Sequence, residues 1–296
     1  MTTLRRLLGD RAFLTGAVVA AVMVLVALTA PLLTALAGQD PTTYHNDLLD
    51  SARGGVPTGP LGGLDGDHWL GVEPGTGRDL FARVVYGARV SLGVAFSALL
   101  LQLVLGVGIG VAAGLGGRYA DAVLSRLTDL TLAFPGLVLA IALLAVVPQS
   151  WPRPVLLAVV IALLGWAGTA RITRAETLSL KTRDYVAAAR VSGAGPLRVA
   201  RREILPGLAA PVLTYAALVL PGNMISEAGL SFLGVGVRPP TPSWGQMLSS
   251  ATTWFRADPL YVFLPGGLLF VTLLAFVLVA NGVRRALDPR QSEVLR

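Results

Sequence analysis

The chain has 296 residues, of which 54% are hydrophobic and 14% are charged. Soluble globular domains average about 25% charged residues, so this composition excludes an ordinary soluble domain. The chain has no cysteine, which excludes disulfides and thiolate metal sites, and His45 and His68 lie too far apart in one loop to indicate a metal cluster. The net charge of +7 does not by itself indicate nucleic acid, because the position of the charges matters more.

Six runs without a charged residue divide the chain. A membrane-spanning helix needs roughly 17–25 largely apolar residues, and each run is long enough. The sequence therefore predicts an all-α integral membrane protein with six transmembrane helices; the alternative is a large soluble protein with buried helices. The runs cover residues 12–39, 90–117, 130–152, 154–170, 204–226 and 259–283.

An even number of spans places both chain ends on one side of the membrane. The segments expected on that side are the two ends and residues 118–129 and 171–203, which together hold 17 arginines and lysines. The segments expected on the opposite side hold 7. Because cytoplasmic segments carry an excess of basic residues, we expect both termini in the cytoplasm.

Residues 1–11 are the expected cytoplasmic N-terminus, and residues 12–37 are the expected first transmembrane helix. The sequence "ALAG" at 35–38 is similar to the cleavage site of a secretory signal. The apolar region of such a signal has roughly 7–15 residues, whereas this run has 28 and contains Pro31. The sequence therefore favours an uncleaved first span.

Residues 38–89 form a predicted extracytoplasmic loop that is rich in glycine, proline and aspartate. Near its end, a helical period begins after Gly77 and is expected to lead along the membrane surface into the second span. A transmembrane core of five helices is then expected over 90–283, and residues 284–296 are the expected cytoplasmic C-terminus.

Gly106, Gly110 and Gly114 lie four residues apart on one face of the second span. Small residues at this spacing allow two helix backbones to approach closely in a membrane. The partner is either another subunit or a helix of the same bundle. Asp129, next to Arg126, is expected at the membrane surface with a partner nearby.

Glu227 interrupts the fifth apolar run. A carboxylate at the centre of a membrane costs about 2.5–3.5 kcal/mol, so we expect this one to face protein or water. It either lines a translocation path or marks a helix end where the chain bends back, near Gly229 and Gly234. The preceding Pro221 and Gly222 favour the bend.

Residues 184–207 resemble neither of the apolar runs that flank them. The sequence "YVAAARV" predicts a helix that ends near Gly193 and Gly195, and Pro196 suits the first turn of a second helix. In that helix, Leu197, Ala200 and Ile204 are expected on one face and the arginines on the other. Such a helix pair is an anchor on the lipid surface, a passive loop or a docking element for a soluble protein.

The pattern of two alanines, three residues, a glycine and then Ile-Leu-Pro resembles the signature loop of ABC importer permease subunits. Further segments are similar to segments of the permease subunits of dipeptide and oligopeptide (peptide/nickel) importers. Among these, the chain resembles the second permease-type subunit. The similar segments are "HWLGVEPGTGRDLFARVVYGARVSL" (68–92), "FPGLVLAIALL" (134–144), "EAGLSFLGVGVRPPTPSWGQML" (227–248) and "ALDPR" (286–290).

The resemblance implies that the cytoplasmic loop is a coupling helix between spans four and five, which fits a groove in a separate ATPase. It also implies an extracytoplasmic motif at Gly77, Arg78 and Asp79. The residues expected to take part in ATPase coupling are Ala188, Ala189, Gly193, Gly195, Arg202, Leu205 and Pro206.

The implied partners are a homologous permease subunit, two cytoplasmic ATPases, an extracytoplasmic substrate-binding protein and the lipid bilayer, without nucleic acid. The implied location is the bacterial inner or plasma membrane. A phosphate-binding loop needs a lysine after a glycine, but the only lysine, Lys181, follows Leu180. We therefore expect no catalytic or metal site and no cofactor in this chain, with ATP and magnesium held by the ATPases.

The chain departs from the family pattern at several positions. Ala187 replaces a frequent glutamate, Glu203 replaces the usual histidine, and Gly207 replaces an asparagine. In the extracytoplasmic motif, Val72 and Glu73 replace the threonine and aspartate of the family pattern. One residue is also inserted before Gly77. The glycine turn of the coupling loop is retained, so docking is still expected.

Two other functions compete with an ATP-driven importer for peptides or similar small solutes. A secondary transporter would need ionisable residues near the membrane centre, and only Glu227 qualifies. An intramembrane enzyme would need converging catalytic side chains, and no such cluster falls within the spans.

Overall fold

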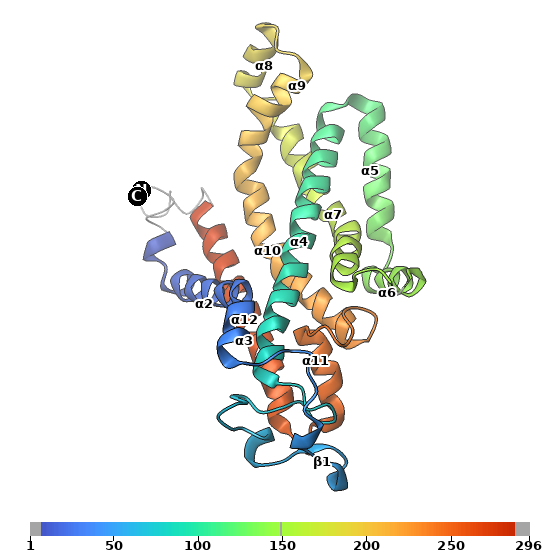
Figure 1. Cartoon of the computed structure of the whole chain (residues 1–296). Helices are drawn as coiled ribbons and strands as arrows, with labels where there is room; N and C mark the ends of the chain where they lie inside the picture. The colour runs from blue at the N-terminus through green and yellow to red at the C-terminus, as the bar shows by residue number, and fades with distance from the viewer. Residues whose placement is uncertain (1–6, 149, 288–296) are drawn as a thin grey trace.

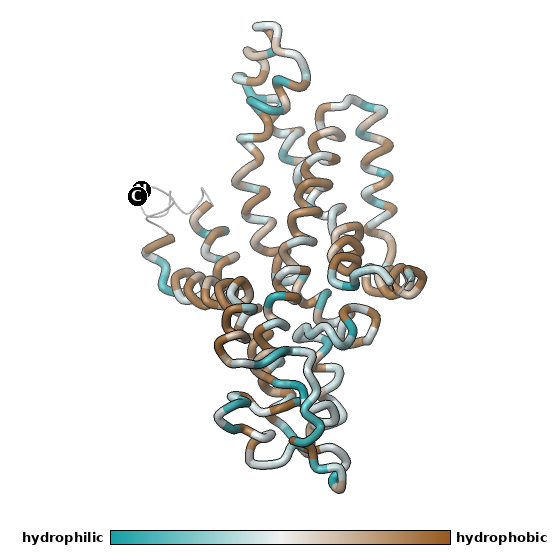
Figure 2. The backbone as a smooth tube through the Cα atoms, viewed as in Figure 1, coloured by the Kyte–Doolittle hydropathy of each residue, from teal (hydrophilic) through white to brown (hydrophobic). Residues whose placement is uncertain are grey.

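The computed structural model describes residues 7–148 and 150–287, so the expected terminal segments 1–11 and 284–296 are only partly covered. Five described helices are long and apolar enough to cross a membrane, and a sixth span results if one sharply bent helix pair counts as one. These numbers agree with the predicted all-α architecture. Brown, apolar tube fills the middle of the molecule in Figure 2.

The first span is not one helix. It consists of α2 (Arg11–Leu28) and α3 (Ala30–Ala37), which meet at Thr29. Pro31 stands in the first turn of α3, where its missing N–H costs no helical hydrogen bond. The single helix expected over 12–37 is therefore wrong in this respect, and the proline explains why.

The second span, α4 (Leu80–Leu115), is one unbroken helix of 36 residues. The expected surface segment before it is simply its first turns. At 1.5 Å per residue the helix is about 54 Å long, whereas a bilayer core is about 30 Å thick. In Figure 1, α4 reaches from the end of the molecule that holds β1 (Leu49–Asp50) and α11 (Trp244–Ala251) toward the opposite end.

The third run, 130–152, contains only the end of α5 (Gly117–Ala133) together with α6 (Gly136–Val146), and these two helices are bent by 88° relative to each other. Residues 118–129, expected as a segment between two spans, are helical and belong to α5. The bend follows from Pro135, since a proline disfavours the helical conformation of the residue before it. Phe134 is accordingly extended, with φ −82° and ψ 141°.

Two further boundaries differ from the prediction. Helix α7 (Arg153–Leu180) continues well into the segment expected as a loop at 171–203. Helix α10 (Leu205–Phe232) passes through Pro221 and Gly222 and continues beyond residue 226, where the fifth apolar run ends. The chain then turns at Gly234, whose φ is +77°, as expected for a bend near Gly229 and Gly234. The sixth span is α12 (Pro259–Leu287).

The remaining elements are short and lie at the two ends of the bundle. At one end, α8 (Asp184–Val191) and α9 (Pro196–Val199) lead through a π-helical turn at Ala200–Ile204 into α10. At the other end, β1 pairs with β2 (Val56–Pro57) in an antiparallel hairpin. Short 3-10 turns complete this end at Asn46–Leu48, Ser51–Arg53, Pro60–Gly62 and Thr252–Trp254.

The glycine face of α4 lies against α7 of the same chain. A Cβ atom built on Gly110 would come within 2.6 Å of the carbonyl oxygen of Ala170 and within 2.7 Å of Cβ of Thr173. Gly106 and Gly114 meet α7 in the same way, at Thr169 and Thr177. Of the two partners considered for this face, the described structure shows a helix of the same bundle.

We expect Gly110→Ala to lower the free energy of unfolding by about 1–3 kcal/mol, because the added methyl group has no room between α4 and α7. Gly108→Ala is the matched control on the same helix, since nothing lies within 4 Å of its position. Thermal unfolding in lipid nanodiscs measures both. Equal stability of the two variants contradicts the packing argument.

Candidate functional site

The α8–α9 segment forms a protruding tip at one end of the molecule (Figure 1). Gly193 has a φ of +85°, and its N–H donates to the carbonyl of Arg190 at 2.9 Å, which closes α8. Only glycine adopts this left-handed conformation without strain. Gly195, by contrast, has a φ of −69°, which any residue can adopt. None of the described residues has an atom within 4 Å of a Cβ atom built at either glycine.

A small hydrophobic cluster anchors the tip. Val186 of α8, Val199 of α9 and Ile204 of the π-turn are buried together. Partly buried side chains from the ends of α4 and α7, including Leu115 and Leu180, pack against them. The tip is therefore connected to the membrane helices by apolar packing rather than by a flexible linker.

The π-turn changes which side chains of the second helix share a face. A π-turn inserts one residue into the helical repeat and rotates everything beyond it. Ile204 is therefore buried, whereas Leu197 is 72% exposed. The expectation that Leu197 and Ile204 share a buried face is wrong for this reason, and Val199 takes the inner position.

The outer surface of the tip combines apolar and basic side chains. Val191 is 90% exposed, which with Leu197 places two large apolar groups on opposite sides of the Gly193 turn. The residues expected to take part in coupling are exposed, except Ala189, which is partly buried: Ala188, Ala189, Gly193, Gly195, Arg202, Leu205 and Pro206. Two positions at which the chain departs from the family pattern also lie in this tip: Ala187 is exposed and Glu203 is partly buried.

Three polar contacts join helices α4, α5 and α7 beneath the tip. Arg174 of α7 donates to Asp121 of α5, with 2.7 Å from Nη2 to Oδ2, and Lys181 Nζ donates to the Gly114 carbonyl at 2.9 Å. Asp129 pairs with Arg171 at 2.9 Å, not with the neighbouring Arg126. The partner expected near Asp129 is therefore supplied by α7, which packs beside α5.

At the opposite end, each residue of the Gly-Arg-Asp motif has a distinct structural task. Gly77 has a φ of +67°, and a Cβ atom there would overlap the His45 carbonyl. Asp79 caps α4, since its Oδ1 accepts the Ala82 N–H at 2.6 Å, and its Oδ2 lies 2.9 Å from Nδ1 of His68.

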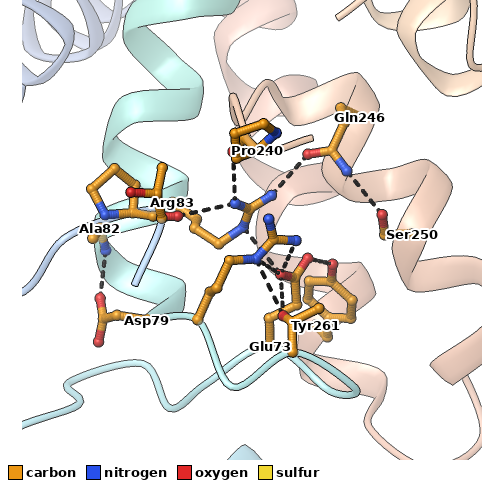
Figure 3. Close-up of polar contacts among 12 residues, drawn as sticks. Glu73, Asp79, Ala82, Arg83, Pro240, Gln246, Ser250 and Tyr261 are labelled. Carbon is orange, nitrogen blue, oxygen red and sulfur yellow. Dashed lines mark hydrogen bonds and ion pairs between the residues drawn. The ribbon is translucent and has the colours of Figure 1, made fainter. Parts of the chain in front are cut away.

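Arg78, the remaining residue of the motif, joins a buried ionic cluster centred on Glu73 (Figure 3). Its Nε donates to Glu73 Oε2 at 2.6 Å, and the hydroxyl of Tyr261 on α12 donates to the other carboxylate oxygen. Arg83, which is fully buried, lies 3.4 Å from the same Oε2. Two arginines and a tyrosine thus stabilise one buried carboxylate.

Arg83 extends the cluster to three distant segments. Its guanidinium donates to the carbonyls of Pro41 and Pro240 and to Oε1 of Gln246 on α11, at 3.1, 3.2 and 2.8 Å. Figure 3 shows this side chain between Gln246 and Glu73. The cluster therefore connects the loop that precedes α4 with α4, α11 and α12.

Sequence reasoning missed most of this cluster. The sequence predicts no role for Arg83, and it marks Glu73 only as a departure from the family motif. An arginine one turn after the helix-capping Asp79 was the available signal, but Gln246 and Tyr261 are more than 160 positions away. No local pattern connects them.

Glu227 is completely buried inside the bundle near the end of α10. Ser231 donates to its Oε1 at 2.9 Å and accepts the N–H of Val237 at 3.0 Å. The carboxylate therefore faces protein and is connected with the turn that follows α10.

A buried amide pair joins α4 and α10 between the two ends of the bundle. Gln102 Nε2 donates to Asn223 Oδ1 at 3.1 Å, and Asn223 Nδ2 donates back to Gln102 Oε1 at 3.0 Å. Gln102 also donates to the carbonyl of Ile161 on α7, and glycine at position 165 leaves room for it. The pair lines a cavity of about 240 Å³ that also contacts α6.

The fold and its arrangement of spans and tip define a membrane permease component. Residues 106–293 match the family described as "Binding-protein-dependent transport system inner membrane component", and the chain belongs to this family. The chain has 18% identity and a TM-score of 0.55 to a chain of the MetNI methionine ABC transporter solved in inward-facing conformations. That similarity covers 70% of this chain and 97% of the other, and it supports the fold.

Among curated proteins, the chain is 32% identical to the dipeptide transport system permease protein DppC of Alkalihalophilus pseudofirmus, over 97% of this chain and 88% of that protein. It is 37% identical to the glutathione transport system permease protein GsiD of Pectobacterium atrosepticum, over 75% and 73%. It is 39% identical to the nickel transport system permease protein NikC of Escherichia coli, over 76% and 80%. The resemblance to peptide and nickel ABC permeases is confirmed.

We expect Arg83→Gln to lower the free energy of unfolding by about 3–5 kcal/mol, because it leaves a buried carboxylate with one cation fewer and three acceptors unpaired. Arg53→Gln is the control, since Arg53 belongs to the same loop and its side chain is 81% exposed. Denaturant unfolding in detergent micelles compares them. A loss below 1 kcal/mol, roughly the value of a surface pair, contradicts a stabilising role of the cluster.

Proposed function

We propose that this chain is the membrane-spanning permease subunit of an ATP-driven importer for peptides or similar small solutes, and that the α8–α9 tip docks on a separate ATPase. The observation that carries the proposal is the tip itself. It exposes two large apolar side chains around a glycine turn, yet its base is firmly packed against α4 and α7.

The chemistry of the tip favours a protein partner over a lipid surface. A surface anchor needs its apolar side chains on one side and its basic side chains on the other. Here the exposed Val191 and Leu197 each have an exposed arginine as a direct neighbour in the chain, Arg190 and Arg198, so apolar and basic side chains alternate around the turn. An apolar groove with an acidic rim is the complementary surface that we expect on the ATPase.

The packed base explains how ATP hydrolysis could act on the spans. A push on the tip is transmitted through Val186 and Ile204 to α10 and to the ends of α4 and α7. Helices packed in this way move as rigid bodies between discrete states. ATP and magnesium belong to the ATPases in this proposal, and the permease supplies the moving path.

The proposed orientation places the tip in the cytoplasm and the Glu73 cluster outside. The excess of basic residues around the tip supports it. The extracytoplasmic end would receive substrate from a binding protein, and a homologous permease subunit would complete the path. The relatives named for dipeptide, glutathione and nickel transport support a peptide or a similarly small solute as the substrate.

The competing proposal is a secondary transporter that works without an ATPase. Such proteins use ionisable groups within reach of the path. Glu227, the acid expected near the membrane centre, is completely buried, and Ser231 donates to its Oε1. Ion-driven uptake by the chain alone, reconstituted without ATPases, would decide for this competitor.

We expect Gly193→Phe to reduce ATP-dependent uptake roughly tenfold or more, the effect of losing about 1.4 kcal/mol of docking free energy. Membrane insertion and the basal hydrolysis of the ATPases should remain. Gly195→Ala is the control, since its φ of −69° accepts a side chain. Uptake and coupled hydrolysis in proteoliposomes measure both, and normal uptake by Gly193→Phe refutes docking at this turn.

A second test separates docking from folding. Val191→Ser and Leu197→Ser remove exposed apolar groups that contribute little to the fold, so each should weaken binding of the ATPases roughly tenfold without changing the melting temperature. Tyr119→Ser is the control, because Tyr119 is 87% exposed but lies on α5. Co-purification from membranes at graded ATPase concentration gives the affinities, and unchanged binding contradicts an apolar contact at the tip.

A further inference from the structure

A cavity at the end of the bundle opposite the tip has no role in the ionic cluster or in docking. Its volume is about 470 Å³, within the usual range for small-ligand sites. The loop contributes Val56, Pro57, Leu61 and Gly62, and the start of α12 contributes apolar residues such as Phe263. Apart from Asp258, the side chains that line the cavity are apolar.

Asp258 is the one titratable residue among the described residues that line this cavity. It is only 5% exposed, and its Oδ1 accepts the N–H of Tyr261 at 3.4 Å in the first turn of α12. Its Oδ2 is buried and has no hydrogen-bond partner within the part of the chain that the structure describes. Burial raises the pKa of this carboxyl above its ordinary value, against the opposing backbone hydrogen bonds.

A buried carboxylate oxygen without a partner is costly, and such groups are normally paired with a cation or hydrogen-bonded. Among residues 7–148 and 150–287, no arginine or lysine forms an ion pair with Asp258. Arg256, two residues before it, points into solvent as an exposed residue. None of the described residues therefore supplies a cation for this carboxyl group.

The backbone of residues 59–63 lies close to the Asp258 carboxyl group. A Cβ atom at Gly62 would come within 2.9 Å of Oδ2, and Gly62 has a φ of +80°. Gly59, Leu61 and Gly63 also have positive φ values, of 98°, 50° and 78°. Leu61 is the only described residue other than glycine with this conformation, and its side chain is exposed.

We propose that Asp258 and this cavity bind a primary ammonium group on a short apolar stem, with the Gly59–Gly63 segment shifting to admit it. The single free oxygen suits a compact ammonium charge, whereas a guanidinium fork needs two oxygens and Oδ1 is already engaged. The apolar walls accommodate the stem. Two sources supply this chemistry: the amino end of a free peptide, or a lysine side chain of an extracytoplasmic protein.

The test uses the full chain in lipid nanodiscs and three neutral-backbone probes measured by titration calorimetry. Nα-acetyl-lysine amide carries only a side-chain ammonium, alanyl-alanine amide carries only an α-ammonium, and Nα-acetyl-norleucine amide carries no charge. We expect at least one charged probe to bind, and the neutral probe to bind roughly tenfold more weakly or not at all, since a charge-assisted bond is lost. The stronger charged probe identifies the source.

Asp258→Asn keeps the shape and the helix-capping oxygen, and it should weaken binding of the charged probe roughly tenfold or more. Asp47→Asn, an exposed acid of the same loop, should leave binding unchanged. If the asparagine variant unfolds, Asp258→Ser also retains a capping oxygen and replaces it. Equal binding of charged and neutral probes, or full binding by either Asp258 variant, overturns the proposal. Neither result bears on docking at the tip.

Discussion

The length of α4 is the constraint on which the rest of the structure depends. A helix of 36 residues is longer than a bilayer core is thick, so α4 crosses the apolar middle of the molecule and extends into both ends. Its first turns hold the Glu73 cluster, its last turns support the tip, and its glycine face holds α7 in between. Any displacement at one end must therefore be accommodated along the whole helix.

The two ends of α4 are stabilised by different physics. At the tip, Val186 and Ile204 are held in an apolar cluster, and apolar packing has no preferred bond direction. At the other end, Arg83 bonds to groups from three segments and is completely buried. Removing any partner of a buried charge is expensive, so this end is suited to remain rigid while the other responds.

The amide pair of Gln102 and Asn223 lies between these ends and connects α4, α7 and α10 by hydrogen bonds. All four amide hydrogens have an acceptor within the protein, including the carbonyls of Ile161 and Ala95. Away from water, such fully satisfied networks fix one arrangement more strongly than apolar packing alone. The proposed movement of the tip would thus be shared by three helices rather than by one.

The sequence by itself determined the membrane class, the number of apolar runs, the basic tip with its glycine turn and the family, because composition, charge spacing and turn chemistry are local properties. It could not determine the sharp bend at Pro135 between α5 and α6, or that a π-turn exposes Leu197. Only the tertiary structure brought Glu73, Arg83 and Tyr261 together and left Oδ2 of Asp258 without a partner among the described residues. Those relations depend on which distant segments pack side by side, and long-range packing leaves no periodic trace in the chain.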